Sequence, residues 1–122
     1  MANATLYTRL GSYDGISAFA EALLKRLTAD RQLGRFWLNR GIDGVLREKQ
    51  LLVDYLSAST GGPMYYTGRD MKLAHRGMGI SNSDWALFIC HVQAVFDEFG
   101  VAEGERAEVL AFLHNTKDDI VE

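Results

Sequence analysis

Apolar residues recur at intervals of three and four along almost the whole chain, and this spacing constrains the fold more than any other feature. It marks one face of a helix over about 14–29, 43–59 and 83–99, and again from 103 onward. No stretch has the alternating pattern of a strand. The chain is therefore predicted to be all-α. Its 122 residues, 48% of them hydrophobic, suffice for one domain over residues 1–122.

The second predicted helix ends at a firm break. Gly61 and Gly62 are followed by Pro63, the only proline, and proline cannot continue a helix. We expect residues 64–81 to form a long connector that contains at most a short helix around 70–76. A connector of this length inside a compact helical domain is often functional, so we expect site residues in it.

The composition argues against several classes of function. The formal net charge is −3, and without clustered Lys and Arg neither a nucleic-acid partner nor binding to a membrane surface is expected. Cys90 is the only cysteine, which argues against an internal disulfide and a cysteine-rich zinc site. No apolar run approaches the roughly 18–20 residues that span a bilayer. No signal-peptide pattern opens the chain, so we expect a cytoplasmic protein.

His75 is the first candidate for chemistry, because it lies in the predicted short helix of the connector. An isolated histidine is more often an ordinary residue than a ligand, but imidazole is the usual proximal ligand of haem iron. Haem also needs a slot between helices that is lined by aromatic and aliphatic side chains. The residues that could form that slot, or could equally be plain core, are Phe19, Leu46, Trp85, Phe88 and Ile89.

Gln50 is the second candidate, because it lies inside the apolar stripe of the second predicted helix. That stripe runs through Leu46, Val53 and Leu56, and is widened by Leu51, Leu52 and Tyr55. A primary amide on an apolar face costs free energy unless it finds a hydrogen-bond partner. Gln50 is expected either to bond a loop carbonyl or to point at a ligand in a cavity. Its neighbours Arg47 and Lys49 are either solvated or paired with an anionic cofactor.

Taken in order, these features resemble the group 1 (N-type) truncated haemoglobins. The motif consists of the break at Gly61-Gly62, the turn Tyr66-Thr67-Gly68, Met71, and His75 four residues later. The opening from Leu6 to Gly11 and the pair Lys49-Gln50 are also similar, so the resemblance extends over nearly the whole chain. It implies a two-over-two helical sandwich, which is a shortened globin fold, enclosing one haem b per chain. The implied function is reversible binding of a diatomic gas: dioxygen, nitric oxide or carbon monoxide.

The resemblance also assigns the site. His75 would be the proximal iron ligand, and Leu24, Leu46 and Gln50 would form the distal pocket. Leu24 stands where many relatives carry tyrosine, which leaves Gln50 as the only obvious polar group. Lys49 stands where some relatives supply a sixth iron ligand. The expected haem contacts are Phe36, Trp37, Leu46, Lys49, Gln50, Tyr66, Arg69, Met71, His75, Ile80, Trp85 and Phe88.

Three roles remain open for such a globin, and no catalytic residue is assigned. It binds gas reversibly, it acts as a nitric oxide dioxygenase with a reductase as electron donor, or it senses a gas. The rival from another class is a haem-free helical interaction module, whose apolar stripes would be pure core. We expect a monomer or a weak dimer with no nucleic-acid or membrane partner.

Overall fold

Four long helices account for most of the chain, and the computed structural model describes residues 5–38, 41–63, 66, 68 and 70–122. Within these residues the structure is helical and has no strand, which confirms the all-α prediction. Each long helix begins within two residues of the start expected from the periodicity, and the first three end at the expected residue. The elements are α1 (Leu6–Arg9), α2 (Ser12–Ala29), the 3₁₀ helix η1 (Leu33–Trp37), α3 (Ile42–Ser59), α4 (Met71–His75), α5 (Asn82–Phe99) and α6 (Glu103–Ile120).

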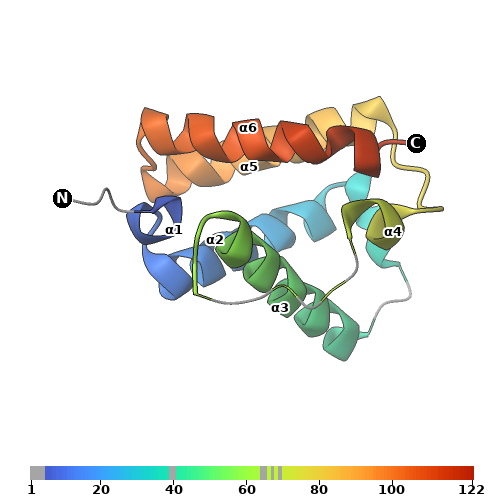
Figure 1. Cartoon of the computed structure of the whole chain (residues 1–122). Coiled ribbons are helices and arrows are strands. Elements are labelled where there is room, and N and C mark those ends of the chain that lie inside the picture. The colour runs from blue at the N-terminus through green and yellow to red at the C-terminus, as the bar shows by residue number, and fades with distance from the viewer. Residues whose placement is uncertain (1–4, 39–40, 64–65, 67, 69) are drawn as a thin grey trace.

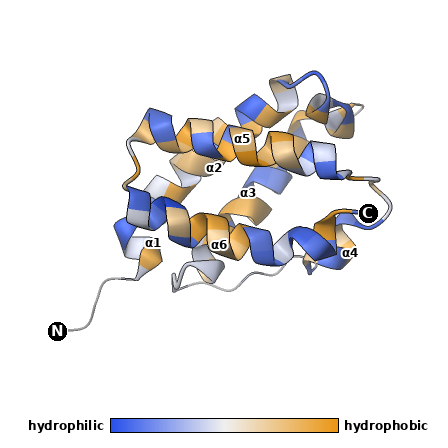
Figure 2. Cartoon of the chain, turned by 90° about the horizontal axis from the view of Figure 1, so that it is seen from above, coloured by the Kyte–Doolittle hydropathy of each residue, from blue (hydrophilic) through white to orange (hydrophobic). Residues whose placement is uncertain are grey.

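The long helices form two layers, as the resemblance to a two-over-two sandwich implies. Helices α5 and α6 lie side by side in the upper layer of Figure 1, and α2 and α3 lie in the lower one. Helix α2 packs against α3 on one side and α5 on the other, while the short helix α4 packs against α6. Hydrophobic residues recur along the long helices (Figure 2), and the buried ones pack against one another between the helices. This arrangement leaves α4 facing the interior from one side.

The core follows the two faces of α2. One buried cluster joins α2 to α5 and α6, and its largest member is Phe96. A second cluster joins α2 to α3 through Ile16, Ala20, Val53 and Leu56. Helix α3 therefore turns the face that carries Val53 toward α2, and only its opposite face is left to line a site.

The glycine break after α3 has a steric cause. Gly61 adopts a φ of +95°, in the left-handed region that favours glycine. The amide of Gly62 donates to the carbonyl oxygen of Ser57 at 2.8 Å, and a Cβ on Gly62 would lie 2.8 Å from that oxygen. The two glycines thus turn the chain sharply out of α3 toward the connector that leads to α4.

Candidate functional site

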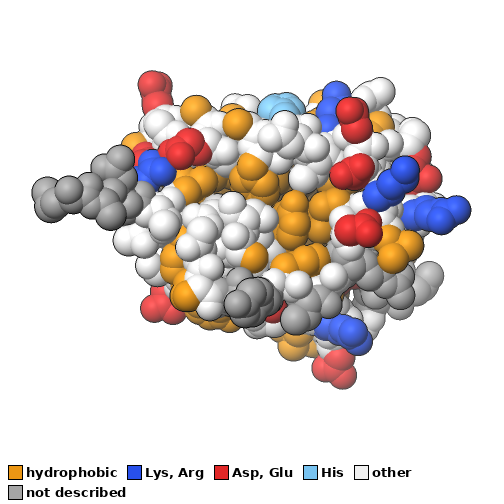
Figure 3. Space-filling model, viewed as in Figure 1, with side chains coloured by type: hydrophobic (Ala, Val, Ile, Leu, Met, Phe, Trp, Pro, Cys, Tyr) orange, Lys and Arg blue, Asp and Glu red, His pale blue; other side chains and the backbone are white. Residues whose placement is uncertain are grey.

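A cavity of about 1040 Å³ opens among α2, η1, α3, α4, α5 and α6. Its volume is at the upper end of the range for cofactor sites, and its lining is mostly aliphatic and aromatic, as in such sites. Figure 3 shows hydrophobic side chains gathered between α6 and the segments below it, with charged side chains around them. The apolar lining includes Leu23, Leu24, Leu27, Phe36, Trp37, Leu51, Leu52, Met71, Met78, Ile80, Trp85, Phe88 and Leu113.

His75 lines this cavity as the last residue of α4. Asp70 starts the helix by accepting a hydrogen bond from the Leu73 amide at 2.8 Å. His75 Nδ1 lies 2.8 Å from the carbonyl oxygen of Met71. A carbonyl can only accept, so Nδ1 carries a proton and donates this bond; in the neutral imidazole, Nε2 is then the nitrogen with the free lone pair. This is the arrangement in which protein imidazoles bind metals, with the far nitrogen fixed by a backbone acceptor.

The aromatic residues predicted from η1 and α5 also reach the cavity. Phe36 and Trp37 both line it, and their rings are 6.4 Å apart in an edge-to-face arrangement. Trp85 and Phe88 line it from α5, with ring centroids 5.4 Å apart. Either aromatic of η1 can therefore contact a flat ligand in this cavity.

Trp85 carries an unusual polar atom. The residue is 4% exposed, and its buried Nε1 has no hydrogen-bond partner among the described residues. An unpaired buried N–H costs free energy. The atom is fully buried, so this N–H lies inside the wall and not on its cavity surface.

Three predicted haem contacts on α3 lie outside the cavity lining, which corrects their expected placement. Leu46 is 57% exposed. Gln50 is exposed, and its Nε2 donates to Asp54 Oδ1 at 2.9 Å and to Tyr13 Oη at 3.1 Å. Lys49 Nζ lies 3.6 Å from Glu21 Oε2 on α2. The polar partners of Gln50 and Lys49 are thus other surface side chains.

Helical geometry gives the reason for this correction. At about 100° per residue, the cavity-lining residues of α3 fall on one face: Gly44, Arg47, Glu48, Leu51, Leu52 and Tyr55. Leu46, Gln50 and Val53 fall on the opposite side, which Val53 anchors to α2. The sequence did not single out three of these cavity-lining residues, Glu48, Leu52 and Tyr55. The widening of the apolar stripe through Leu51, Leu52 and Tyr55 was nevertheless visible in the sequence.

The connector contributes Tyr66 to the wall, whereas Arg69 lies outside the described residues. The Tyr66 ring packs edge-on against Tyr55 at 5.2 Å. Burial, followed by the nearby Tyr55 and Asp70, raises the pKa of Tyr66, so its phenol stays protonated and can donate a hydrogen bond. Arg47 lines the cavity as an exposed residue and offers a cation at the solvent side.

Asp84 fixes the start of α5 beside this cavity. Its carboxylate is 1% exposed and receives two bonds from the Arg35 guanidinium, at 2.9 and 2.6 Å, and one from Gln32 at 2.7 Å. It also accepts from the Ser81 amide, which completes a capping box. The Arg35 bond, above all, holds the pKa of Asp84 well below its usual range. The ion pair joins η1 to α5, two elements of the cavity wall.

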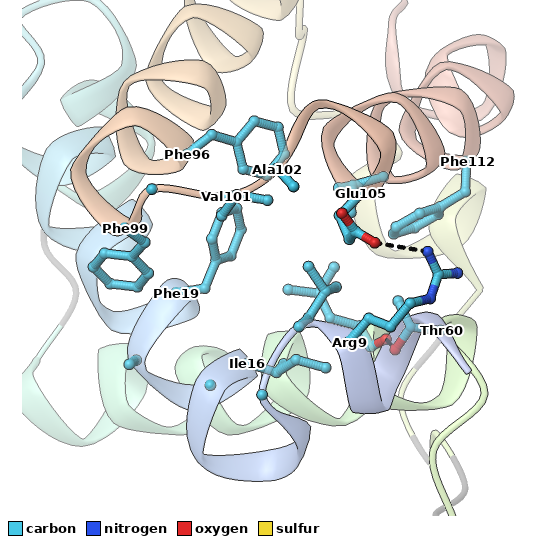
Figure 4. Close-up of a pocket in the computed structure, with 17 residues that line it drawn as sticks. Arg9, Ile16, Phe19, Thr60, Phe96, Phe99, Val101, Ala102, Glu105 and Phe112 are labelled. Atoms are coloured by element: carbon cyan, nitrogen blue, oxygen red, sulfur yellow. Dashed lines mark hydrogen bonds and ion pairs between the residues drawn. The ribbon is translucent and has the colours of Figure 1, made fainter. Parts of the chain in front are cut away.

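A second cavity, of about 700 Å³, lies near α1 and the connection between α5 and α6. Figure 4 shows Phe19, Phe96, Phe99 and Phe112 around it, with the ion pair of Arg9 and Glu105 at one side. Of the residues that the sequence offered for the haem site, only Phe19 is among the described residues that line it. The larger cavity is therefore the one that holds the predicted site.

The ligand chemistry of the described residues suits an organic cofactor. They contain no group of three or more His, Cys, Asp or Glu that could hold a bare metal ion. A lone imidazole facing a large apolar cavity fits a metal whose other ligands come with a macrocycle, as in haem. Among the residues that were searched, no helix is long and apolar enough to cross a bilayer.

Comparison with known proteins agrees with this geometry. The model of the bacterial-like globin family matches residues 5–122. A group 1 truncated haemoglobin from Tetrahymena pyriformis is 27% identical over 117 residues, which cover 96% of this chain and 94% of that protein. The group 1 truncated haemoglobin GlbN of Mycolicibacterium paratuberculosis is 32% identical over 107 residues, which cover 88% and 76%.

Solved structures give the same result for the fold. The crystal structure of the truncated haemoglobin from Tetrahymena pyriformis in its Fe(III) form superposes with a TM-score of 0.88 at 26% identity, covering 97% of this chain and 98% of that one. The two-over-two haemoglobin from Synechococcus sp. PCC 7002, with covalently attached haem, superposes with a TM-score of 0.87 at 22% identity.

Proposed function

We propose a residue-level assignment of the haem site in this chain, which belongs to the bacterial-like globin family and, within it, to the group 1 truncated haemoglobins. Members of this family bind haem and diatomic gases, and this chain is such a haem-binding globin. We assign one haem b per chain to the cavity of about 1040 Å³. We assign iron ligation to Nε2 of His75.

The orientation of His75 carries this assignment. Its Nδ1 proton is committed to the Met71 carbonyl, which leaves Nε2 as the ligating atom on a side chain that lines the cavity. This observation concerns the chain's own residue and does not depend on its relatives.

The other lining residues would hold the cofactor and exclude water. When bound, haem supplies an iron atom that binds a gas molecule. Phe36, Trp37 and Phe88 would pack on the ring, and Tyr66 and the exposed Arg47 would face its carboxylates. Leu24 is 9% exposed in the lining, and it brings no hydrogen-bond donor to the gas.

Titration of the purified protein with haemin tests the assignment. A Soret band should grow until one equivalent of haemin per chain is bound, and carbon monoxide should shift it after reduction. A protein whose spectrum never departs from that of free haemin would contradict the proposal.

Replacing Leu24 with tyrosine should slow the release of dioxygen. A new phenol donor in the lining would stabilise this polar ligand by about 0.5–1.5 kcal/mol, which corresponds to a release slower by up to about tenfold. Carbon monoxide is much less polar when bound and should be affected less. The matched control is Leu24→Phe, which adds the ring without the hydroxyl. Stopped-flow release rates that are equal in the two variants would contradict the role of the donor.

Lys49→Ala should leave the spectrum of the ferric protein unchanged. Lys49 pairs with Glu21 and lies outside the cavity lining, so its amine is not placed to ligate iron. The absorption spectrum of the ferric form reports the spin state directly. A low-spin form that became high-spin in the variant would show that Lys49 is the sixth ligand after all.

A further inference from the structure

We infer that Glu122 is a positioning residue for the haem site, because it fixes the loop that follows His75 and so sets the orientation of the imidazole. The inference rests on the haem site proposed above and adds to it a residue that is remote in the sequence. Glu122 lies just beyond α6, and the sequence pattern did not connect it with His75.

Helix α4, which carries His75, does not hold its own position. It has only five residues, and none of them is buried. A helix this short has little stability of its own. Its place therefore depends on its two ends and on its packing against α6, whose last turn lies beside it in both cartoon views (Figure 1 and Figure 2). The Asp70 cap fixes the first end, and the second end needs a support from elsewhere.

The loop after His75 has a backbone that local structure alone does not fix. Gly77 and Gly79 adopt φ values of +81° and +68°, and glycine loses more conformational freedom on ordering than any other residue. The Met78 amide donates to the carbonyl oxygen of His75 at 3.2 Å, which joins the loop directly to the histidine. A shift of the loop is therefore passed on to the backbone of His75 and to its ring.

Glu122 holds this loop with two hydrogen bonds. Its Oε1 accepts from the Gly79 amide at 3.1 Å, and its own amide donates to the carbonyl oxygen of Ile80 at 2.8 Å. Ile80 is 9% exposed and lines the haem cavity, as Met78 does. Because the two bonds reach adjacent residues, they fix both the position and the direction of the chain at this part of the wall.

The elements on either side of this contact are themselves well anchored. Helix α6 packs into the core through Val109 and Leu113, and the capping box at Ser81 fixes the start of α5 directly after the loop. The loop thus runs from an exposed short helix to a fixed long one, and Glu122 is its support between them. Without that support, the ring of His75 would sample more orientations.

Resonance Raman spectroscopy of the haem-loaded ferrous protein tests this through the iron–histidine stretching band. In Glu122→Ala the band should broaden, and transfer of haemin to an excess of a haem-free scavenger globin should become about threefold to tenfold faster, as expected for one lost hydrogen bond. Glu122→Gln keeps an acceptor oxygen and should restore both properties. The matched control is Asp119→Ala, an exposed acid of the last turn of α6, which should change neither.

A second measurement needs no haem. In the haem-free parent, the Gly79 amide is bonded to Glu122, so proton–nitrogen NMR should show it exchanging slowly with deuterated solvent. In Glu122→Ala this exchange should be about threefold to tenfold faster, while Glu122→Gln and Asp119→Ala should keep the parent rate. A Gly79 exchange rate that is equal in the parent and Glu122→Ala would overturn the inference.

These experiments also separate the inference from the proposed function. A parent protein that binds no haemin would contradict the proposed function itself. A parent that binds haemin, with an iron–histidine band of the same width in Glu122→Ala, would overturn only the role of Glu122.

Discussion

His75→Ala should abolish stable haem binding. The Soret band of the haemin-titrated protein should collapse toward that of free haemin, with a loss of affinity of at least about a hundredfold. Removing only an outer hydrogen bond to a metal ligand already costs about 10–100-fold. His75 is the imidazole that lines the cavity, and its Nδ1 bond to Met71 prepares the other nitrogen for iron.

Two controls separate loss of ligation from loss of fold. His91→Ala removes a histidine of α5 that bonds Asp30 at 2.7 Å and lies outside the cavity lining, so it should keep the Soret band. Added imidazole should restore a haem spectrum to His75→Ala, because the variant has space where the ring was. A His75→Ala protein with an unaltered Soret band and unaltered carbon monoxide spectrum would show that another side chain holds the iron.

The sequence predicted the long helices for clear physical reasons, and the resemblance to a known family singled out His75. Apolar spacing follows directly from the 3.6-residue turn, so α2, α3, α5 and α6 appear where expected. The structure places His75 in the cavity wall because the glycine break and the Asp70 cap set the position of α4, and both are local signals.

The distal side could not be predicted in the same way. Helix α3 has an apolar residue on each of two faces, Val53 toward α2 and Leu52 toward the cavity. Periodicity shows that both faces are buried, but it does not show which neighbour covers which. Gln50 shares a face with Val53, so its amide bonds Tyr13 and Asp54. From the sequence alone, Glu48 is expected to be an ordinary surface residue. Its hydrogen bond from Trp37 depends on the packing of η1 against α3, which the sequence pattern does not show.

Asp84→Ala should be the most destabilising change to a polar residue at the start of α5. It removes the acceptor for Arg35, Gln32 and the Ser81 amide at a site that is 1% exposed. Breaking a buried pair costs about 3–5 kcal/mol. Arg35 is half-exposed and can return to water, so we expect a loss of about 3 kcal/mol. Urea unfolding followed by circular dichroism measures it.

Helix α5 supplies its own control for this prediction. Asp97 also bonds an arginine, Arg106, but its side chain is 74% exposed, and exposed pairs contribute about 0–1 kcal/mol. Asp97→Ala should therefore cost less than about 1 kcal/mol. Equal losses in the two variants would mean that burial does not strengthen the Asp84 pair.

The pH dependence of stability gives an independent check on the same residue. Because the pKa of Asp84 is lowered in the folded chain, the folded state binds its proton less readily than the unfolded state does. Its contribution is complete above the ordinary aspartate value of about 3.9 and is lost as the pH falls from there toward the lowered folded value. The difference in unfolding free energy between the parent and Asp84→Ala should accordingly shrink below about pH 4. A difference that stayed constant from pH 7 to pH 3 would assign the loss to packing around Asp84 and not to its charge.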